Sequence, residues 1–264
     1  MADKTGIQWT DATWNPIRGC SVVSGGCKNC YAMRTARRHS GPERPYEGLT
    51  ELRSGKPMWN GKIRLVPELL DQPLRWTKPR RVFVNSMSDL FHEAVPDEFV
   101  MAVMGVMAAC PQHVFQILTK RPERMVRLMG EDQWPLMQCA GAADKIMRPS
   151  ATIARKLYAH FDDVMGESDL DGPPLPNVWL GLSVEDQATA DERIPLLLRC
   201  PAARHWAVVR EGVRLDSLPA NLGALPGRDG CWDWFDALTG IGEGPNEYYS
   251  EGQVFPKLDF VERP

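Results

Sequence analysis

The strongest constraint on the fold is a repeated alternation of strand-like and helix-like segments. Short runs rich in β-branched and aromatic residues alternate with longer segments that open on proline or acidic residues. The strand-like runs are RRVFVNS, HVFQILT, NVWLGLSV and ARHWAVVR, separated by the helix-like segments PDEFVMAVMGVMAAC, RPERMVRLMG and EDQATADERIPLLLRC. This alternation predicts an α/β fold in which parallel strands are joined by helical crossovers.

The number of such units limits how far the sheet can close. WNPIRG, near the N-terminus, is a candidate first strand, which brings the total to four or five βα units. We therefore expect a partial (β/α) barrel of parallel strands within residues 1–212, with a helical insertion at about 131–176 that contains a helix near 150–163. The alternation decays after Arg214, so residues 213–264 are predicted to be a divergent C-terminal tail.

The composition favours a cytoplasmic protein with no membrane segment. No apolar run approaches the roughly 20 residues that a membrane-spanning helix needs, and the N-terminus lacks the pattern of a secretory signal. In the cytoplasm the seven cysteines should stay reduced. Metal binding or chemistry is then a better expectation for them than a disulfide framework.

Three of these cysteines, Cys20, Cys27 and Cys30, lie within GCSVVSGGCKNCYA. One interpretation is a structural zinc site completed by His39 or His92. The other is an iron–sulfur cluster held by three thiolates, whose open iron would bind S-adenosyl-L-methionine.

Polar side chains follow the predicted strands and form the candidate site. Because the carboxyl ends of parallel strands meet at one edge of a sheet, these side chains are expected to lie together beside the cysteines. They are Ser86, Ser88, Asp89, Lys120, Glu185, Asp186 and Glu211. For Asp186, capping of the following helix is an alternative role.

The charge distribution is asymmetric although the whole chain carries a net charge of -3. Residues 1–130 contain 19 basic and 12 acidic residues, whereas residues 131–264 contain 12 basic and 22 acidic residues. Basic residues crowd just after the cysteines, at Lys28, Arg34, Arg37, Arg38 and Arg44. They indicate either a nucleic-acid-binding surface or a solvated helix face that pairs with the acidic half.

Four blocks of the chain resemble a phage- and bacterium-associated family of unknown function that is grouped with the radical S-adenosylmethionine (radical SAM) enzymes. The blocks are GIQWTDATWNPIRGCSVVSGGCKNCYA, RVFVNSMSDLFHEAVPDE, HVFQILTKRPERM and NVWLGLSVEDQATADERIPLLL. The resemblance implies a radical-SAM-like fold in which Cys20, Cys27 and Cys30 ligate a [4Fe-4S] cluster. The spacing here is Cys-x6-Cys-x2-Cys, in place of the superfamily's usual Cys-x3-Cys-x2-Cys.

The resemblance also implies an activity. With an electron donor, the cluster would cleave S-adenosyl-L-methionine to a 5′-deoxyadenosyl radical that acts on a substrate. We expect nucleic acid, DNA rather than RNA, as that substrate, either in photolesion repair, as in spore-photoproduct-lyase-like relatives, or in base modification. Lys28, Arg34, Arg37 and Arg38 would contact it.

Roles for the strand-end residues follow from their positions. We assign cofactor binding to Ser86, Ser88, Asp89, Glu185 and Glu211, and catalysis to Lys120, Glu185 and Asp186.

The chain departs from its relatives after about residue 203, because their last two strand blocks are absent. The barrel is therefore predicted to be shortened at the C-terminus, with either the tail 213–264 or a partner protein covering its open edge. The alternative function is a non-catalytic module, stabilised by a metal or a cluster, that binds nucleic acid or protein.

Overall fold

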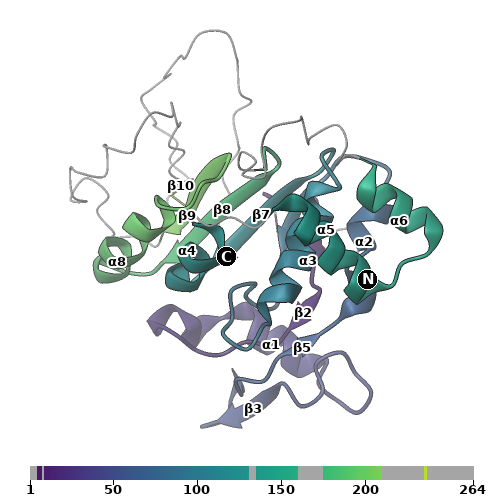
Figure 1. Ribbon diagram of the computed structural model, residues 1–264. Coiled ribbons are helices and arrows are strands. Elements are labelled where there is room, and N and C mark those ends of the chain that lie inside the picture. The colour runs from purple at the N-terminus through teal and green to yellow at the C-terminus, as the bar shows by residue number, and fades with distance from the viewer. Residues whose placement is uncertain (1–4, 8, 131–134, 160–174, 210–234, 237–264) are drawn as a thin grey trace.

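A parallel β-sheet forms the centre of this computed structural model, which describes residues 5–7, 9–130, 135–159, 175–209 and 235–236 (Figure 1). The strands lie in the order β1-β6-β7-β8-β9-β10 and every neighbouring pair is parallel. They are β1 (Ala12–Trp14), β6 (Arg81–Val84), β7 (Val114–Thr119), β8 (Val178–Val184), β9 (Arg204–Val209) and the two-residue β10 (Phe235–Asp236). The spatial order equals the chain order, so each crossover adds the next strand on the same side. Within the described residues β1 and β10 have one neighbour each, and the sheet is open.

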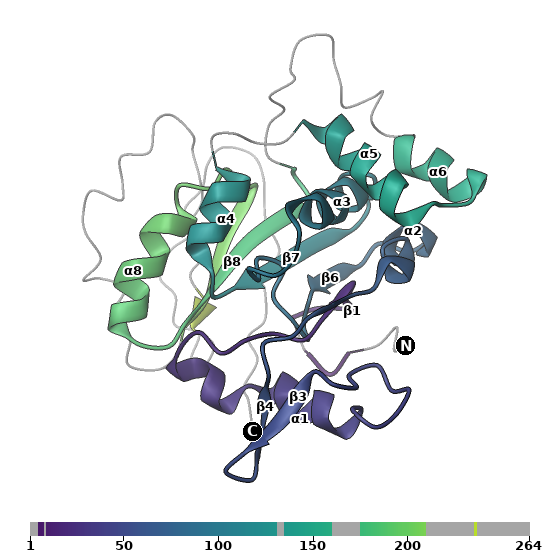
Figure 2. The same cartoon turned by 60° about the horizontal axis from the view of Figure 1, so that its bottom comes forward.

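One face of the sheet is covered by the crossover helices (Figure 2). These are α3 (Asp97–Ala108), α4 (Pro122–Met129) and α8 (Gln187–Leu197), with α5 (Leu136–Met147) and α6 (Ala151–Tyr158) lying beyond α3. These helices begin where local sequence signals predict: α3 has two acidic residues in its first turn, and α4 begins at a proline.

The alternation of side chains along the strands separates a helix-facing core from an inner face. Val82, Phe115 and Leu180 belong to the main core, which the helices complete. On the other side, the ring of Trp9 lies 4.7 Å from Phe83 and 5.2 Å from Trp206. The inner face of the sheet, opposite the helices, is therefore lined with aromatic side chains and extends to the ends of the strands.

A small second unit, formed between β1 and β6, packs around its own core. Its elements are β2 (Ile17–Arg18), the 3-10 helix η1 (Gly25–Asn29), α1 (Tyr31–Arg38), the hairpin strands β3 (Thr50–Arg53) and β4 (Lys56–Trp59), and β5 (Arg64–Leu65), which pairs with β2. Cys27, Met33, Leu49, Trp59 and Met87 are buried together in this core. Figure 2 shows α1 and the hairpin lying apart from the layer of crossover helices.

The α/β class and the open parallel sheet confirm the predicted fold at that level. The first sheet strand ends at Trp14, before most of WNPIRG, and Ile17–Arg18 pair with β5 instead. The segment VPELLDQPLRW forms a short 3-10 turn, η2 (Pro67–Leu69), and a one-turn helix, α2 (Gln72–Arg75), because Pro73 interrupts it.

Helix α5 is absent from the sequence-based expectation, which placed a single helix near 150–163; α6 lies within that range. The domain boundaries remain predictions. Glu211 and nearly all of the tail beyond residue 212 lie outside the residues that the structure describes. No helix in the described part of the chain is long and apolar enough to span a membrane.

Candidate functional site

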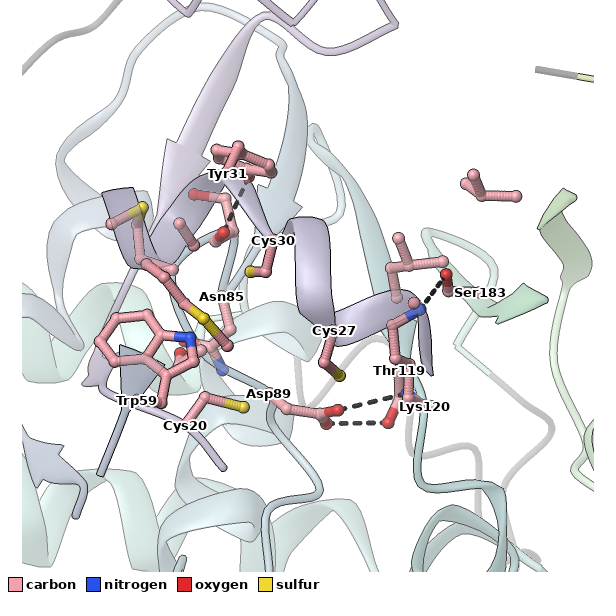
Figure 3. Close-up of a pocket in the computed structure, with 18 of the residues that line it drawn as sticks. Cys20, Cys27, Cys30, Tyr31, Trp59, Asn85, Asp89, Thr119, Lys120 and Ser183 are labelled. Atoms are coloured by element: carbon pink, nitrogen blue, oxygen red, sulfur yellow. Dashed lines mark hydrogen bonds between the residues drawn. The ribbon is translucent and has the colours of Figure 1, made fainter. Parts of the chain in front are cut away.

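A pocket of about 420 Å³ lies at the carboxyl ends of β6, β7 and β8 (Figure 3). Its size falls within the range of small-molecule sites, about 300–1,000 Å³. The structure brings eight of the predicted site residues to its wall: Cys20, Cys27, Cys30, Ser86, Ser88, Asp89, Lys120 and Glu185. Strand ends and cysteines therefore converge on one space, as the βα pattern predicts.

The three cysteines come from one continuous segment on one side of this pocket. Cys20 follows β2, Cys27 is buried in η1, and Cys30 lies between η1 and α1. Their sulfur atoms face the same space in Figure 3. Burial, together with the nearby carboxylate of Asp89, raises the pKa of the Cys20 thiol to about 12 against the opposing charge of Arg121.

Neither predicted zinc-ligand histidine joins the cysteines. His39 is exposed, with Nδ1 2.9 Å from the carbonyl oxygen of Thr35, and Nδ1 of the buried His92 accepts from the backbone N–H of Ala94. Among the described residues, no group of three Cys, His, Asp or Glu side chains has the geometry for a single metal ion. In the described part of the chain, the zinc interpretation with His39 or His92 as fourth ligand is therefore not assembled.

Arg121, at the start of α4, anchors the first part of the cysteine loop. Its side chain is 4% exposed and donates from Nη2 to Ser21 Oγ at 2.8 Å, while Nη1 lies 3.7 Å from Cys20 Sγ. Nη1 also donates to Asp89 Oδ2 at 2.9 Å and Nε donates to Glu93 at 3.0 Å. These carboxylates raise the pKa of the guanidinium against its burial, so a fixed positive charge lies beside Cys20.

Asp89 joins the ends of β6 and β7. Besides Arg121, it accepts hydrogen bonds from Thr119 Oγ1 at 2.8 Å and from the backbone N–H groups of Phe91 and Lys120 at 3.0 and 3.2 Å. The carboxylate is thus engaged by four protein donors, and its role in this structure is to hold the pocket wall.

Glu185, at the end of β8, anchors the second part of the cysteine loop. Ser24 Oγ donates to Glu185 Oε1 at 2.7 Å, and the same carboxylate pairs with Lys120 Nζ at 2.5 Å and with Arg193 Nη1 at 3.0 Å. Burial opposes ionisation, but these three partners together hold the pKa of Glu185 below its usual value. A carboxylate so engaged is a positioning group rather than a proton donor.

Gly26 makes this contact between the loop and Glu185 possible. A Cβ atom at residue 26 would lie 2.2 Å from Cγ and 2.4 Å from Oε1 of Glu185, well inside contact distance. Lys120 completes the cluster by donating also to the hydroxyl of Ser183.

The two predicted serines tie the pocket floor to the N-terminal segment. Ser86 Oγ donates to Asn15 Oδ1 at 3.1 Å, and Ser88 Oγ donates to the carbonyl of Ile17 at 2.9 Å. The hydroxyl of Tyr31, the first residue of α1, donates to the carbonyl of Ser86 at 2.8 Å. Loops after β1 and β6 are therefore locked together under the cysteines.

Asn85 is a pocket residue that sequence reasoning missed. It follows β6 with φ of 58°, is 2% exposed, and among the described residues neither Oδ1 nor Nδ2 has a hydrogen-bond partner. Its side chain lines the pocket near Cys20 and Cys30 (Figure 3). The signal was an Asn directly after a buried strand, since Asn tolerates a left-handed backbone. A buried, unpartnered amide offers one donor group and one acceptor to a ligand.

The remaining predicted residues lie elsewhere. Asp186 is exposed, caps α8 by accepting from the Thr189 N–H at 2.9 Å, and does not line the pocket. Glu211 lies outside the described residues. The four predicted nucleic-acid contacts, Lys28, Arg34, Arg37 and Arg38, are exposed on η1 and α1.

Comparison with known proteins identifies a family without assigning an activity. No curated protein and no solved structure matches the chain significantly. Residues 4–213 match the family described as "Protein of unknown function (DUF5131)", and this span includes the sheet strands from β1 to β9 but not β10. The chain therefore belongs to this family of proteins of unknown function.

Proposed function

We propose that the protein is a radical SAM enzyme in which Cys20, Cys27 and Cys30 hold a [4Fe-4S] cluster and the adjoining pocket binds S-adenosyl-L-methionine. The observation that carries the proposal is the convergence of three cysteines on one pocket at the carboxyl end of a parallel sheet. In such sheets the chemistry is placed at that end. The consecutive strand order also supports a radical-SAM-like partial barrel.

The donor set fits this cluster. The residues that line the pocket include three cysteines and no histidine, so no fourth ligand of either kind is at hand among the described residues. Three thiolates suit a cluster that keeps one iron open. The other described cysteines, Cys110, Cys139 and Cys200, are buried away from the pocket.

When bound and reduced by an electron donor, the cluster and S-adenosyl-L-methionine would supply hydrogen abstraction by reductive cleavage of the sulfonium. The chain's own residues position the parts. Arg121 and Glu185 hold the cysteine loop at Ser21 and Ser24, and Arg121 sets a positive charge beside Cys20. Asn85 supplies the unpartnered amide that a polar ligand would satisfy.

Anaerobic reconstitution tests the proposal. The protein should take up about four iron and four sulfide per chain and form 5′-deoxyadenosine from S-adenosyl-L-methionine after reduction. Replacing Cys20, Cys27 and Cys30 by Ala should abolish iron uptake, whereas Cys200→Ala, which removes a buried thiol elsewhere, should leave it unchanged. Loaded protein that forms no 5′-deoxyadenosine would refute the enzymatic activity, and stoichiometric zinc in natively purified protein would refute the cluster.

A further inference from the structure

The unit that carries the cysteines is strongly basic. Residues 18–64, here called the basic unit, contain ten Lys or Arg and three Glu, although the whole chain has a net charge of -3. All of these residues are described in the structure. The basic unit therefore concentrates positive charge on the part of the fold that borders the pocket.

Several cations of the helical layer are paired with acidic residues, whereas in the basic unit Arg53 alone forms an ion pair among the described residues, with Glu51. Arg124 and Arg127 both bind Asp97, and Lys145 binds Glu98. Seven exposed cations of the basic unit form no ion pair with any described residue: Lys28, Arg34, Arg37, Arg38, Arg44, Lys56 and Lys62. Within the part of the chain that the structure describes, these seven cations are therefore free to meet an external anion.

The arginines of α1 form one stripe on a fixed support. Arg34, Arg37 and Arg38 are exposed at the helical spacing i, i+3, i+4, while Met33 and Ala36 are buried against the hairpin. Because α1 packs on β3 and β4, the stripe keeps its orientation relative to the pocket.

The stripe leads away from the pocket mouth. Asn29 and Tyr31, at the start of α1, line the pocket, and Lys28 lies between the cysteines Cys27 and Cys30. An eight-residue helix is about 12 Å long, so the arginines lie within about two helical turns of the pocket.

We propose that this surface binds single-stranded nucleic acid, with Arg34, Arg37 and Arg38 contacting phosphates and with the pocket at the end of the stripe receiving a base. Arginine forks match phosphate geometry, and a continuous cationic track suits a polyanion. A single strand can enter a pocket without the unpairing that a duplex base requires. Entry of the base as substrate rests on the proposed function, whereas binding to the surface does not.

The test uses the metal-free full chain and a fluorescein-labelled 16-nucleotide oligo-dT, with anisotropy measured over a range of KCl concentrations. Wild type is compared with R34Q/R37Q/R38Q and with R148Q/R155Q/R199Q, which removes the same charge from exposed positions outside the basic unit. Circular dichroism verifies that both variants fold.

Each lost phosphate contact should reduce the slope of log K against log salt by about 0.7, and hence by about 2 for the stripe variant. That corresponds to about 100-fold weaker binding at 0.1 M salt, whereas the control variant should stay within about threefold of wild type. Equal weakening of both variants, or duplex binding as tight as that of the single strand, would overturn the proposal. The binding assay contains neither cluster nor S-adenosyl-L-methionine. A negative binding result would therefore not contradict the proposed cluster chemistry, and a negative result in the reconstitution experiment would not contradict nucleic-acid binding.

Discussion

The buried guanidinium of Arg121 provides a quantitative test of how the site is held. Arg121→Gln removes the partner of Asp89, and both side chains are less than a tenth exposed. Leaving one member of a buried ion pair alone costs about 3–5 kcal/mol. Asp89 keeps three other donors, Thr119 Oγ1 and two backbone N–H groups, so the lower end of about 3 kcal/mol is expected. For a chain of this size that lowers the unfolding midpoint by about 6–12 °C.

Thermal unfolding of the metal-free protein, followed by circular dichroism, measures this shift. Arg127→Gln is the matched control, because Arg127 lies on the same helix and pairs with Asp97 while 57% exposed. Exposed pairs contribute less than about 1 kcal/mol. The reasoning is refuted if the two variants lose the same stability. The same reasoning predicts that the double variant Arg121→Gln/Asp89→Asn is more stable than Arg121→Gln alone, because the second substitution removes the unpaired charge.

Two further predictions concern the helical layer. Gly105→Ala should lower the unfolding midpoint, because its Cβ would lie 2.3 Å from the backbone oxygen of Cys139 in α5, and overpacking costs about 1–3 kcal/mol. Gly141→Ala, in α5 with open space around it, should instead stabilise by about 0.5–1 kcal/mol; a neutral Gly105→Ala would contradict the close crossing of the two helices. Hydrogen bonds from Arg127 and then Arg124 lower the pKa of Asp97 from 3.8 to about 2. The stabilisation by ionised Asp97 is therefore complete above pH 3.8 and is lost as the pH falls toward 2. In unfolding melts, Asp97→Asn should be less stable than wild type at pH 7, and the gap should narrow only below about pH 4; a gap independent of pH would contradict this.

The strands and most helices were predictable because their signals are local. β-Branched runs mark β6, β7 and β8, and proline or acidic residues mark the starts of α3 and α4. Helix α5 was not predictable in the same way. Its buried positions are mainly alanines and Cys139, which pack because Gly105 lets two backbones approach. That contact joins residues more than thirty positions apart and leaves no periodic signal.

The candidate site shows the same division. Parallel topology predicted that polar strand ends would gather beside the cysteines, and Ser86, Ser88, Asp89, Lys120 and Glu185 do; Asp186 instead caps α8, and Glu211 lies outside the described residues. It did not predict that Asp89 and Glu185 would be engaged by Arg121, Lys120 and Arg193, since these pairings depend on side-chain geometry in three dimensions. Nor did it indicate Asn85, whose significance is its lack of a partner among the described residues.

The two anchors explain how a longer cysteine loop can still present its thiols in a fixed arrangement. Six residues separate Cys20 from Cys27, and fixing each one costs roughly 1–2 kcal/mol of conformational entropy. Ser21 is held by Arg121 and Ser24 by Glu185, so the loop is divided into two spans of two residues each between fixed points. Both anchors are buried charged groups, whose hydrogen bonds are stronger than those of neutral groups. The cysteine loop is thus tied to the ends of β7 and β8 by the protein's own side chains, and under the proposed function these contacts would reduce the free energy that cluster binding spends on ordering the loop.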